Sequence, residues 1–119
     1  MKQILLVEDE EMLVNVLASV LEDEGFTVRK STSAEEALEM LPAFRPDLII
    51  SDIKLDTIDG FTMLENIRST KRDSTVPFIC LTALDDRISQ QRAHQLGAAA
   101  YMTKPFDLDD FVELVKKIL

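Results

Sequence analysis

Short apolar segments alternate with longer segments of helical periodicity along the whole chain. The short segments are rich in aliphatic and β-branched residues, which favours buried β-strands. They cover residues 4–7, 26–29, 48–51, 78–81 and 99–102. Each is followed by a stretch with helical spacing, so the pattern predicts five consecutive strand–helix units.

Three of the predicted helices carry clear boundary signals. Gly25 marks the end of the first helix, and Ser33 with Glu36 predicts a capping box that opens the second. Pro42 ends that helix, and Asp107 opens the last one. The apolar face of the first helix comprises Leu13, Val16, Leu17, Val20 and Leu21, and that of the last comprises Leu108, Phe111, Val112, Val115 and Ile118. Three methionines at helical positions are expected to pack inside: Met12, Met40 and Met63.

The apolar segments "LII" and "FICL" contain no alternating polar positions. Such strands belong in a sheet that is covered on both faces, and intervening helices require parallel pairing with right-handed crossovers. The pattern therefore predicts a doubly wound α/β fold with a five-stranded parallel sheet and helices on both faces. Residues 1–119 contain no repeat or linker, so we expect a single domain.

The composition indicates the cellular compartment in which the protein works. The single cysteine, Cys80, excludes an internal disulfide framework and a multi-cysteine metal site, as expected for a reducing compartment. No apolar run has the length of a signal-peptide core or a membrane helix, so we expect a cytoplasmic protein with no membrane contact. Cys80 is expected to be a buried apolar residue and His94, the lone histidine, a solvated side chain.

The chain carries 22 acidic and 13 basic residues, for a net charge of −9. This sign disfavours direct binding of nucleic acid, whose phosphates require basic side chains. The charge suits a basic protein partner or a cation, and it also suits a solvated acidic surface.

Polar residues gather where the predicted strands end. Glu8 and Asp9 follow the first strand, Asp52 follows the third, Thr82 the fourth, and Lys104 comes shortly after the fifth. Because the carboxyl ends of parallel strands meet at one edge, these side chains are expected to converge there. Two carboxylates about 4 Å apart repel by about 4 kcal/mol at an effective dielectric constant near 20, so the group needs a cation. Oxygen ligands without histidine or cysteine favour Mg²⁺.

A carboxylate beside Mg²⁺, with an amine and a hydroxyl opposite, suits phosphoryl transfer to aspartate. Asp52 is the predicted nucleophile because it ends the central strand "DLIISD". Glu8 and Asp9 are expected to hold the metal, while Thr82 and Lys104 bind the phosphoryl oxygens.

These residues resemble the receiver domains of two-component response regulators. The resemblance covers essentially the whole chain and rests on four segments: "ILLVEDEE", "PDLIISDIKLDTIDG", "VPFICLTA" and "LGAAAYMTKPF". It implies a flavodoxin-like sheet of order 2-1-3-4-5. It also implies that Asp52 is the phosphoacceptor, that the backbone carbonyl of Lys54 is a further Mg²⁺ ligand, and that Lys104 is joined to Pro105 by a cis peptide.

The resemblance further implies a switch. The phosphoryl group comes from a histidine kinase or phosphotransfer protein and draws the Thr82 hydroxyl inward; Tyr101 then moves from solvent into the space left behind. The changed surface of the fourth helix, fifth strand and fifth helix would be read by a downstream protein or effector domain. Such a phosphorelay module transfers and hydrolyses its own phosphoryl group and is not an enzyme for outside substrates. A phosphorylation-dependent homodimer stays open, because the last helix has no distinctive pattern.

Some positions depart from the family pattern, and three other functions are disfavoured. Asp56 stands where the loop usually has proline, and Lys54 and Leu84 occupy positions that tune acyl-phosphate hydrolysis in this family. A flavodoxin-like electron carrier is disfavoured because an acidic loop would repel a flavin phosphate. A metal-dependent phosphatase for outside substrates lacks a cap, and a pseudo-receiver would not need all five polar residues.

Overall fold

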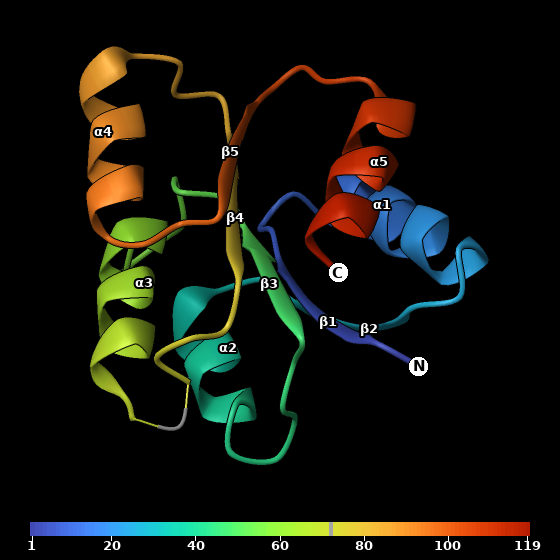
Figure 1. Cartoon of the computed structure of the whole chain (residues 1–119), viewed down its shortest axis with the longest axis horizontal. Helices are drawn as coiled ribbons and strands as arrows, with labels where there is room; N and C mark the ends of the chain where they lie inside the picture. The colour runs from blue at the N-terminus through green and yellow to red at the C-terminus, as the bar shows by residue number, and fades with distance from the viewer. Residues whose placement is uncertain (72) are drawn as a thin grey trace.

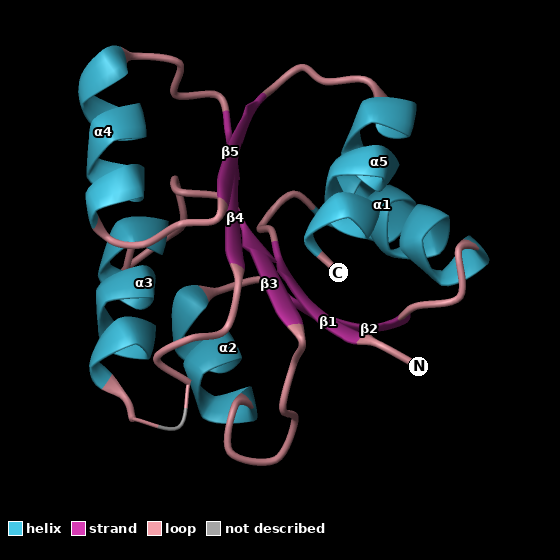
Figure 2. Ribbon diagram, viewed as in Figure 1, coloured by secondary structure: helices cyan, strands magenta, loops and turns pink. Residues whose placement is uncertain are grey.

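The computed structural model describes residues 1–71 and 73–119, in which strands and helices alternate (Figure 2). The elements are β1 (Gln3–Val7), α1 (Glu11–Asp23), β2 (Thr27–Ser31), α2 (Ala34–Met40), β3 (Leu48–Ser51), α3 (Gly60–Ser69), β4 (Phe78–Thr82), α4 (Arg87–Gln95), β5 (Ala100–Thr103) and α5 (Leu108–Ile118). The five predicted strand–helix units are confirmed. None of these helices, within the residues described, is long and apolar enough to cross a membrane.

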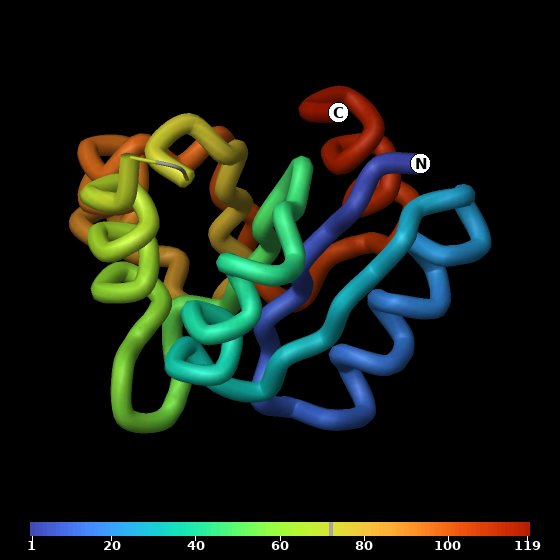
Figure 3. The backbone as a smooth tube through the Cα atoms, turned by 90° about the horizontal axis from the view of Figure 1, so that it is seen from below, coloured from blue at the N-terminus to red at the C-terminus, as the bar shows by residue number. Residues whose placement is uncertain are grey.

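The strands form one parallel sheet in the order β2-β1-β3-β4-β5, as expected. Helices α1 and α5 cover one face, and α2, α3 and α4 cover the other (Figure 1). Figure 3 shows β1 and β2 running side by side along one margin of the sheet. In the register, Val7 lies opposite Ser31 on one side and Ser51 on the other, so the carboxyl ends of these strands are level.

Two apolar clusters fill the space between the sheet and the helices. One lies under α2, α3 and α4 and includes Leu5, Ile49, Phe61 and Phe78. The other lies under α1 and α5 and is built around residues that include Ile4, Leu17, Ile50 and Phe111. Alternate residues of β1 and β3 thus enter opposite clusters, which explains why their sequences show no polar alternation.

The buried face of α1 differs from the prediction. Val14, Leu17, Ala18 and Leu21 are buried, whereas Val16 is 43% exposed. Two overlapping sets in this helix have the same i, i+3, i+4, i+7 spacing, and the set that contains the small Ala18 packs closely on the sheet. The prediction that Met12 packs inside is also wrong, because Met12 lies outside the buried face and is 77% exposed. Met63 is buried as expected, and Met40 packs against the core.

The caps position the helix starts beside the strand ends. The Ser33 hydroxyl accepts a hydrogen bond from the Glu36 amide at 3.1 Å, as predicted. The Ser33 amide donates to the Ser31 hydroxyl at 3.4 Å, where a full capping box would use the Glu36 carboxylate. Asp107 caps α5 as predicted. Strand β2 starts and ends later than predicted, because its outer edge tolerates the exposed Lys30.

Helix α4 is held mainly by polar contacts. Ala93 is its buried residue in the structure as described. Arg68, in the last turn of α3, donates hydrogen bonds to the carbonyls of Val76 (2.7 Å) and Gly97 (2.8 Å), which flank β4 and α4. Arg92 of α4 lies 4.6 Å from the centre of the Phe61 ring, a cation–π contact. These arginines attach the C-terminal half of α4 to α3.

Candidate functional site

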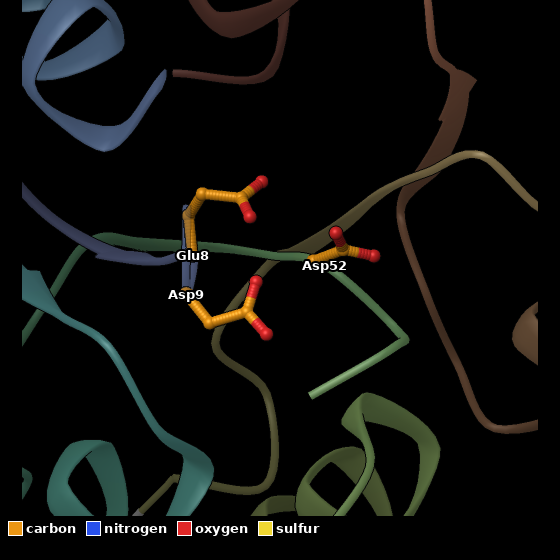
Figure 4. A group of neighbouring side chains, drawn as sticks. All are labelled: Glu8, Asp9 and Asp52. Atoms are coloured by element: carbon orange, nitrogen blue, oxygen red, sulfur yellow. The ribbon is translucent and has the colours of Figure 1, made fainter. Parts of the chain in front are cut away.

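The residues predicted at the strand ends are brought to one edge of the sheet. Glu8 and Asp9 directly follow β1, Asp52 directly follows β3, Thr82 ends β4, and Lys104 directly follows β5. Figure 4 shows the Glu8 and Asp9 side chains leaving the end of β1 on the side where Asp52 lies. One carboxylate oxygen from each of these three acids lies within 4.8 Å of the others.

Lys104 bridges two of the acids. Its Nζ lies 2.6 Å from Glu8 Oε1 and 2.7 Å from Asp52 Oδ2. Glu8 and Asp52 are only 1% and 7% exposed, so the ammonium offsets charge that water cannot reach. The Lys104 amide donates to the Thr82 carbonyl at 2.8 Å, and the Lys104–Pro105 peptide is cis. The sequence placed Lys104 opposite the acids but did not predict this bridge.

The protonation of the bridge follows from burial and pairing. Burial raises the pKa of Glu8, and hydrogen bonds from Lys104 and the Glu10 amide offset only part of this effect. Burial also acts to lower the pKa of Lys104, but its hydrogen bonds to Asp52 and Glu8 outweigh burial and raise the pKa above its ordinary value. Lys104 therefore stays charged at neutral pH.

Asp52 is held from several sides. Its amide donates to the Val7 carbonyl at 3.0 Å, and its Oδ1 accepts a hydrogen bond from the Lys54 amide at 3.1 Å. A Cβ on Gly60 would lie 2.4 Å from the Asp52 carbonyl oxygen, so only glycine lets the start of α3 approach this closely. The need for Gly60 was not predicted, although a glycine at the first position of a helix is a visible signal.

The acid group has the composition of a magnesium site. Three carboxylates offer the hard oxygen ligands that Mg²⁺ prefers. Glu8 and Asp52 are buried, whereas Asp9 is exposed, which leaves one side of the group open for the waters that Mg²⁺ retains. The residues present fit the expected ion, and Lys104, which pairs with two of the acids, supplies one positive charge against their combined negative charge.

Thr82 and Tyr101 meet at the loop after β4. The fully buried Thr82 hydroxyl accepts a hydrogen bond from the Leu84 amide at 3.3 Å. The Tyr101 hydroxyl donates to the Leu84 carbonyl, and burial raises the pKa of Tyr101 to about 12. This corrects the expectation that Tyr101 starts in solvent: its ring is half-buried and already bound to the loop.

The loop between β3 and α3 carries a strained residue. Thr57 has a φ of 63°, a left-handed conformation that β-branched residues rarely adopt. The Ile58 amide donates to the Asp56 carbonyl at 2.7 Å across this residue, which closes a tight turn. Asp56 is exposed, so the residue that replaces the usual proline projects from a loop that hydrogen bonds already shape.

Cys80 and His94, for which the sequence predicts no role in the site, lie where they were expected. Cys80 is fully buried in β4, and burial raises the pKa of its thiol to about 12. His94 is exposed on α4. Neither offers a ligand or a nucleophile at the strand-end edge.

Comparison with known proteins points to the same family. The model of the response regulator receiver domain matches residues 4–116. The alkaline phosphatase synthesis transcriptional regulatory protein PhoP of Bacillus subtilis is 38% identical over 118 residues, covering 99% of this chain and 48% of the relative. The chain spans about half the length of the curated transcriptional regulators that it matches.

Two solved structures share this fold over nearly the whole length of both chains. The chemotaxis response regulator CheY4 of Vibrio cholerae superposes with a TM-score of 0.93 at 25% identity, covering 100% of this chain and 99% of that one. A putative response regulator from Chloroflexus aurantiacus gives a TM-score of 0.92 at 34% identity, covering 98% and 96%. With the sheet order and the acid group already placed, the family match shows that the chain belongs to the response regulator receiver domains.

Proposed function

We propose that Asp52 accepts a phosphoryl group from a histidine kinase or phosphotransfer protein. Receiver domains are signalling switches and not classical enzymes, and membership in this family implies signalling activated by phosphorylation. The observation that carries the assignment is the packing of three carboxylates within 4.8 Å, with Lys104 bound to Glu8 and Asp52. The proposed metal ligands are Glu8, Asp9, Asp52 and the backbone carbonyl of Lys54.

The proposed chemistry uses groups that already surround Asp52. A carboxylate oxygen of Asp52 attacks phosphorus in line with the leaving group of the donor, whose bond to phosphorus breaks. Bound Mg²⁺ would neutralise negative charge on the acids and the phosphoryl oxygens. The Lys104 ammonium, 2.7 Å from Asp52 Oδ2, needs only a short movement to bind a phosphoryl oxygen. The Lys54 amide keeps Asp52 oriented through its bond to Oδ1.

The switch would begin at Thr82. An aspartyl phosphate carries about two negative charges where the carboxylate carried one, and it attracts hydroxyl donors. If the Thr82 hydroxyl turns toward it, the bond from the Leu84 amide is lost. Leu84 also binds Tyr101 through its carbonyl, so its displacement would reach β5 and the start of α4 together. The surface of α4, β5 and α5 is the proposed output.

The proposed partners are proteins. The phosphodonor is a histidine kinase or phosphotransfer protein, and the output surface contacts a downstream protein or effector domain. Curated relatives named as transcriptional regulators are about twice as long as this chain, which fits a receiver that controls a separate effector. The net charge of −9 argues against contact between residues 1–119 and nucleic acid. We propose that these residues act as one receiver unit.

Acetyl phosphate, a small phosphodonor, tests the proposal directly. Intact-protein mass spectrometry should show one added phosphoryl group on the wild type in Mg²⁺ and none after chelation of the metal. Asp52→Ala should stay unmodified, whereas Asp56→Asn should be modified like the wild type, because Asp56 is an exposed acid of the same loop without the metal-site contacts. Modification of Asp52→Ala, or none of the wild type, would refute the assignment.

The switch has its own test. Amide chemical shifts around Leu84, β5 and α4 should change when beryllofluoride, a phosphoryl mimic, binds the wild type. In Thr82→Ala these distant shifts should be much smaller, while shifts beside Asp52 persist, because the hydroxyl that couples the two regions is missing. Equal distant shifts in both proteins would disprove the coupling through Thr82.

A further inference from the structure

Ser51 carries a hydroxyl inside an otherwise apolar strand. It ends β3 in the segment "LIIS" and is fully buried. Its Oγ donates a hydrogen bond to the backbone carbonyl of Asp52 at 2.7 Å. The sequence offered no reason to single out this serine, because its partner is the backbone of the next residue.

The Asp52 carbonyl needs this donor because the strand ladder ends beside it. The Asp52 amide forms a ladder bond to Val7, and β1 ends at that residue. The Glu8 amide faces β2, as alternation along a central strand requires, and donates to the Ser31 carbonyl at 3.0 Å. Among the described backbone bonds, none from the Asp9 amide continues the β1–β3 ladder to the Asp52 carbonyl. The Asp52 carbonyl therefore projects past the last pair of strands, toward Gly60. A buried carbonyl in such a place requires another partner.

With this bond, each polar atom of Asp52 has a described partner. The amide is bound to Val7, the carbonyl to Ser51, Oδ1 to the Lys54 amide and Oδ2 to Lys104. The carbonyl fixes the plane of the peptide that follows Asp52, and this peptide begins the segment that brings the Lys54 amide back to Oδ1. The bond from Ser51 to the Asp52 carbonyl and the bond from the Lys54 amide to Asp52 Oδ1 are thus linked by the short segment between Asp52 and Lys54.

We propose that Ser51 is a positioning residue for phosphoryl transfer. Its hydroxyl fixes the peptide plane after Asp52, and thereby the direction of the Asp52 carboxylate and the place of the Lys54 backbone. This inference rests on the proposed function of Asp52. Loss of the hydroxyl frees the peptide to rotate, so the carboxylate spends less time in line with a phosphodonor and the Lys54 carbonyl is less well placed for Mg²⁺.

The same structure contains a matched control. Ser31 is also buried, also ends a strand, and donates its hydroxyl to a backbone carbonyl, that of Ser33, at 2.8 Å. Its hydroxyl has no bond to Asp52 among the described contacts. Ser51→Ala leaves the Asp52 carbonyl without this donor, whereas Ser31→Ala removes both the bond to the Ser33 carbonyl and the 3.4 Å bond from the Ser33 amide. Ser31→Ala should therefore lower stability to urea at least as much as Ser51→Ala. Only the first should affect the acceptor.

The experiment compares these two variants with the wild type. Rates of phosphorylation by acetyl phosphate in saturating Mg²⁺ should fall about tenfold in Ser51→Ala and remain near the wild-type rate in Ser31→Ala. The Mg²⁺ concentration that gives half of the thermal shift should rise several-fold in Ser51→Ala alone. Ser51→Thr, which keeps the hydroxyl, should recover the rate, and Ser51→Cys, which keeps the shape with a weaker donor, should fall between.

Each failure has a separate meaning. If Ser51→Ala and Ser31→Ala give the same rate and the same Mg²⁺ response, Ser51 has no positioning role, although Asp52 remains the acceptor in the wild type. If Ser51→Ala does not fold, the ranking of Ser51→Cys below Ser51→Thr decides the point, and equal rates for the two overturn the proposal. If the wild type neither responds to Mg²⁺ nor gains a phosphoryl group, the proposed function itself fails.

Discussion

Among the three acids of the site, Asp9 is the one that Lys104 does not bind in the described structure. Removing its charge therefore tests how strongly the acids repel one another. In the described structure the Lys104 bonds go to Glu8 and Asp52, and one ammonium cancels one of these two charges. Asp9 therefore faces about one uncompensated negative charge within 4.8 Å. Replacing it by the similarly shaped asparagine removes this repulsion, so Asp9→Asn should stabilise the protein without metal.

The distance sets the expected size of this effect. A unit charge at 4.8 Å repels Asp9 by about 0.9 kcal/mol in a water-like dielectric and by about 3.5 kcal/mol at an effective dielectric constant of about 20. Because Asp9 is exposed and screened by solvent, we expect a gain of about 1–2 kcal/mol in the free energy of unfolding.

Magnesium should reverse the order of stability. At about 100 times its dissociation constant, a ligand adds about 2.7 kcal/mol to the free energy of unfolding. The wild type should gain this amount, whereas Asp9→Asn loses one of its carboxylate ligands and should gain much less. The variant should therefore be the more stable protein in a chelator and the less stable one in Mg²⁺.

Urea unfolding followed by circular dichroism, with and without Mg²⁺, measures both differences. Asp23→Asn is the matched control: Asp23 is an exposed acid at the opposite end of α1 and should alter neither the metal-free stability nor the response to Mg²⁺ beyond a few tenths of a kcal/mol. An Asp9→Asn protein that is less stable in the chelator, or that gains as much from Mg²⁺ as the wild type, would refute the electrostatic reasoning.

Three further predictions follow from the packing around the site. The Cys80 thiol keeps its proton up to about pH 12 in the native protein, whereas in the unfolded chain it ionises near pH 9. The free energy of unfolding in urea should therefore fall by about 1 kcal/mol between pH 9 and 10, and it should fall less in Cys80→Ala. An equal fall in both proteins would contradict this reasoning. Gly60→Ala should lose about 2–3 kcal/mol in urea unfolding despite the better helix propensity of alanine, because the new methyl meets the Asp52 carbonyl. Thr57→Asn should gain about 0.5–1 kcal/mol in the same assay, since asparagine tolerates a left-handed conformation, and a loss would exclude strain at this turn.

The order of elements and the gathering of the site were predictable because they follow from rules that act over the whole chain. Strand–helix alternation requires a parallel sheet, and a parallel sheet brings the residues after each strand to one edge. The sequence therefore predicts that Glu8, Asp52 and Lys104 lie close together, and the structure brings them together. Their individual partners depend on side-chain geometry that no periodicity encodes.

The failures were local and have physical causes. The buried face of α1 was displaced to include Val16 because two apolar sets share the helical spacing, and only packing against the sheet distinguishes them. Tyr101 was expected in solvent because a sequence does not show that its hydroxyl reaches the Leu84 carbonyl, 17 residues away. The sequence gives no signal for Ser51, because its partner is a backbone carbonyl, which every residue possesses.

The sparse packing of α4 has an energetic consequence. This helix buries Ala93 in the core. Elsewhere it is held by hydrogen bonds and by two arginines, the half-buried Arg68 and the exposed Arg92. Its amide protons should exchange with solvent through partial openings that cost far less than global unfolding, while those of β1, β3 and β4 wait for the whole molecule to unfold. Under the proposed switch, phosphorylation of Asp52 therefore needs to supply only the small free energy of these openings to shift α4, while the core stays folded.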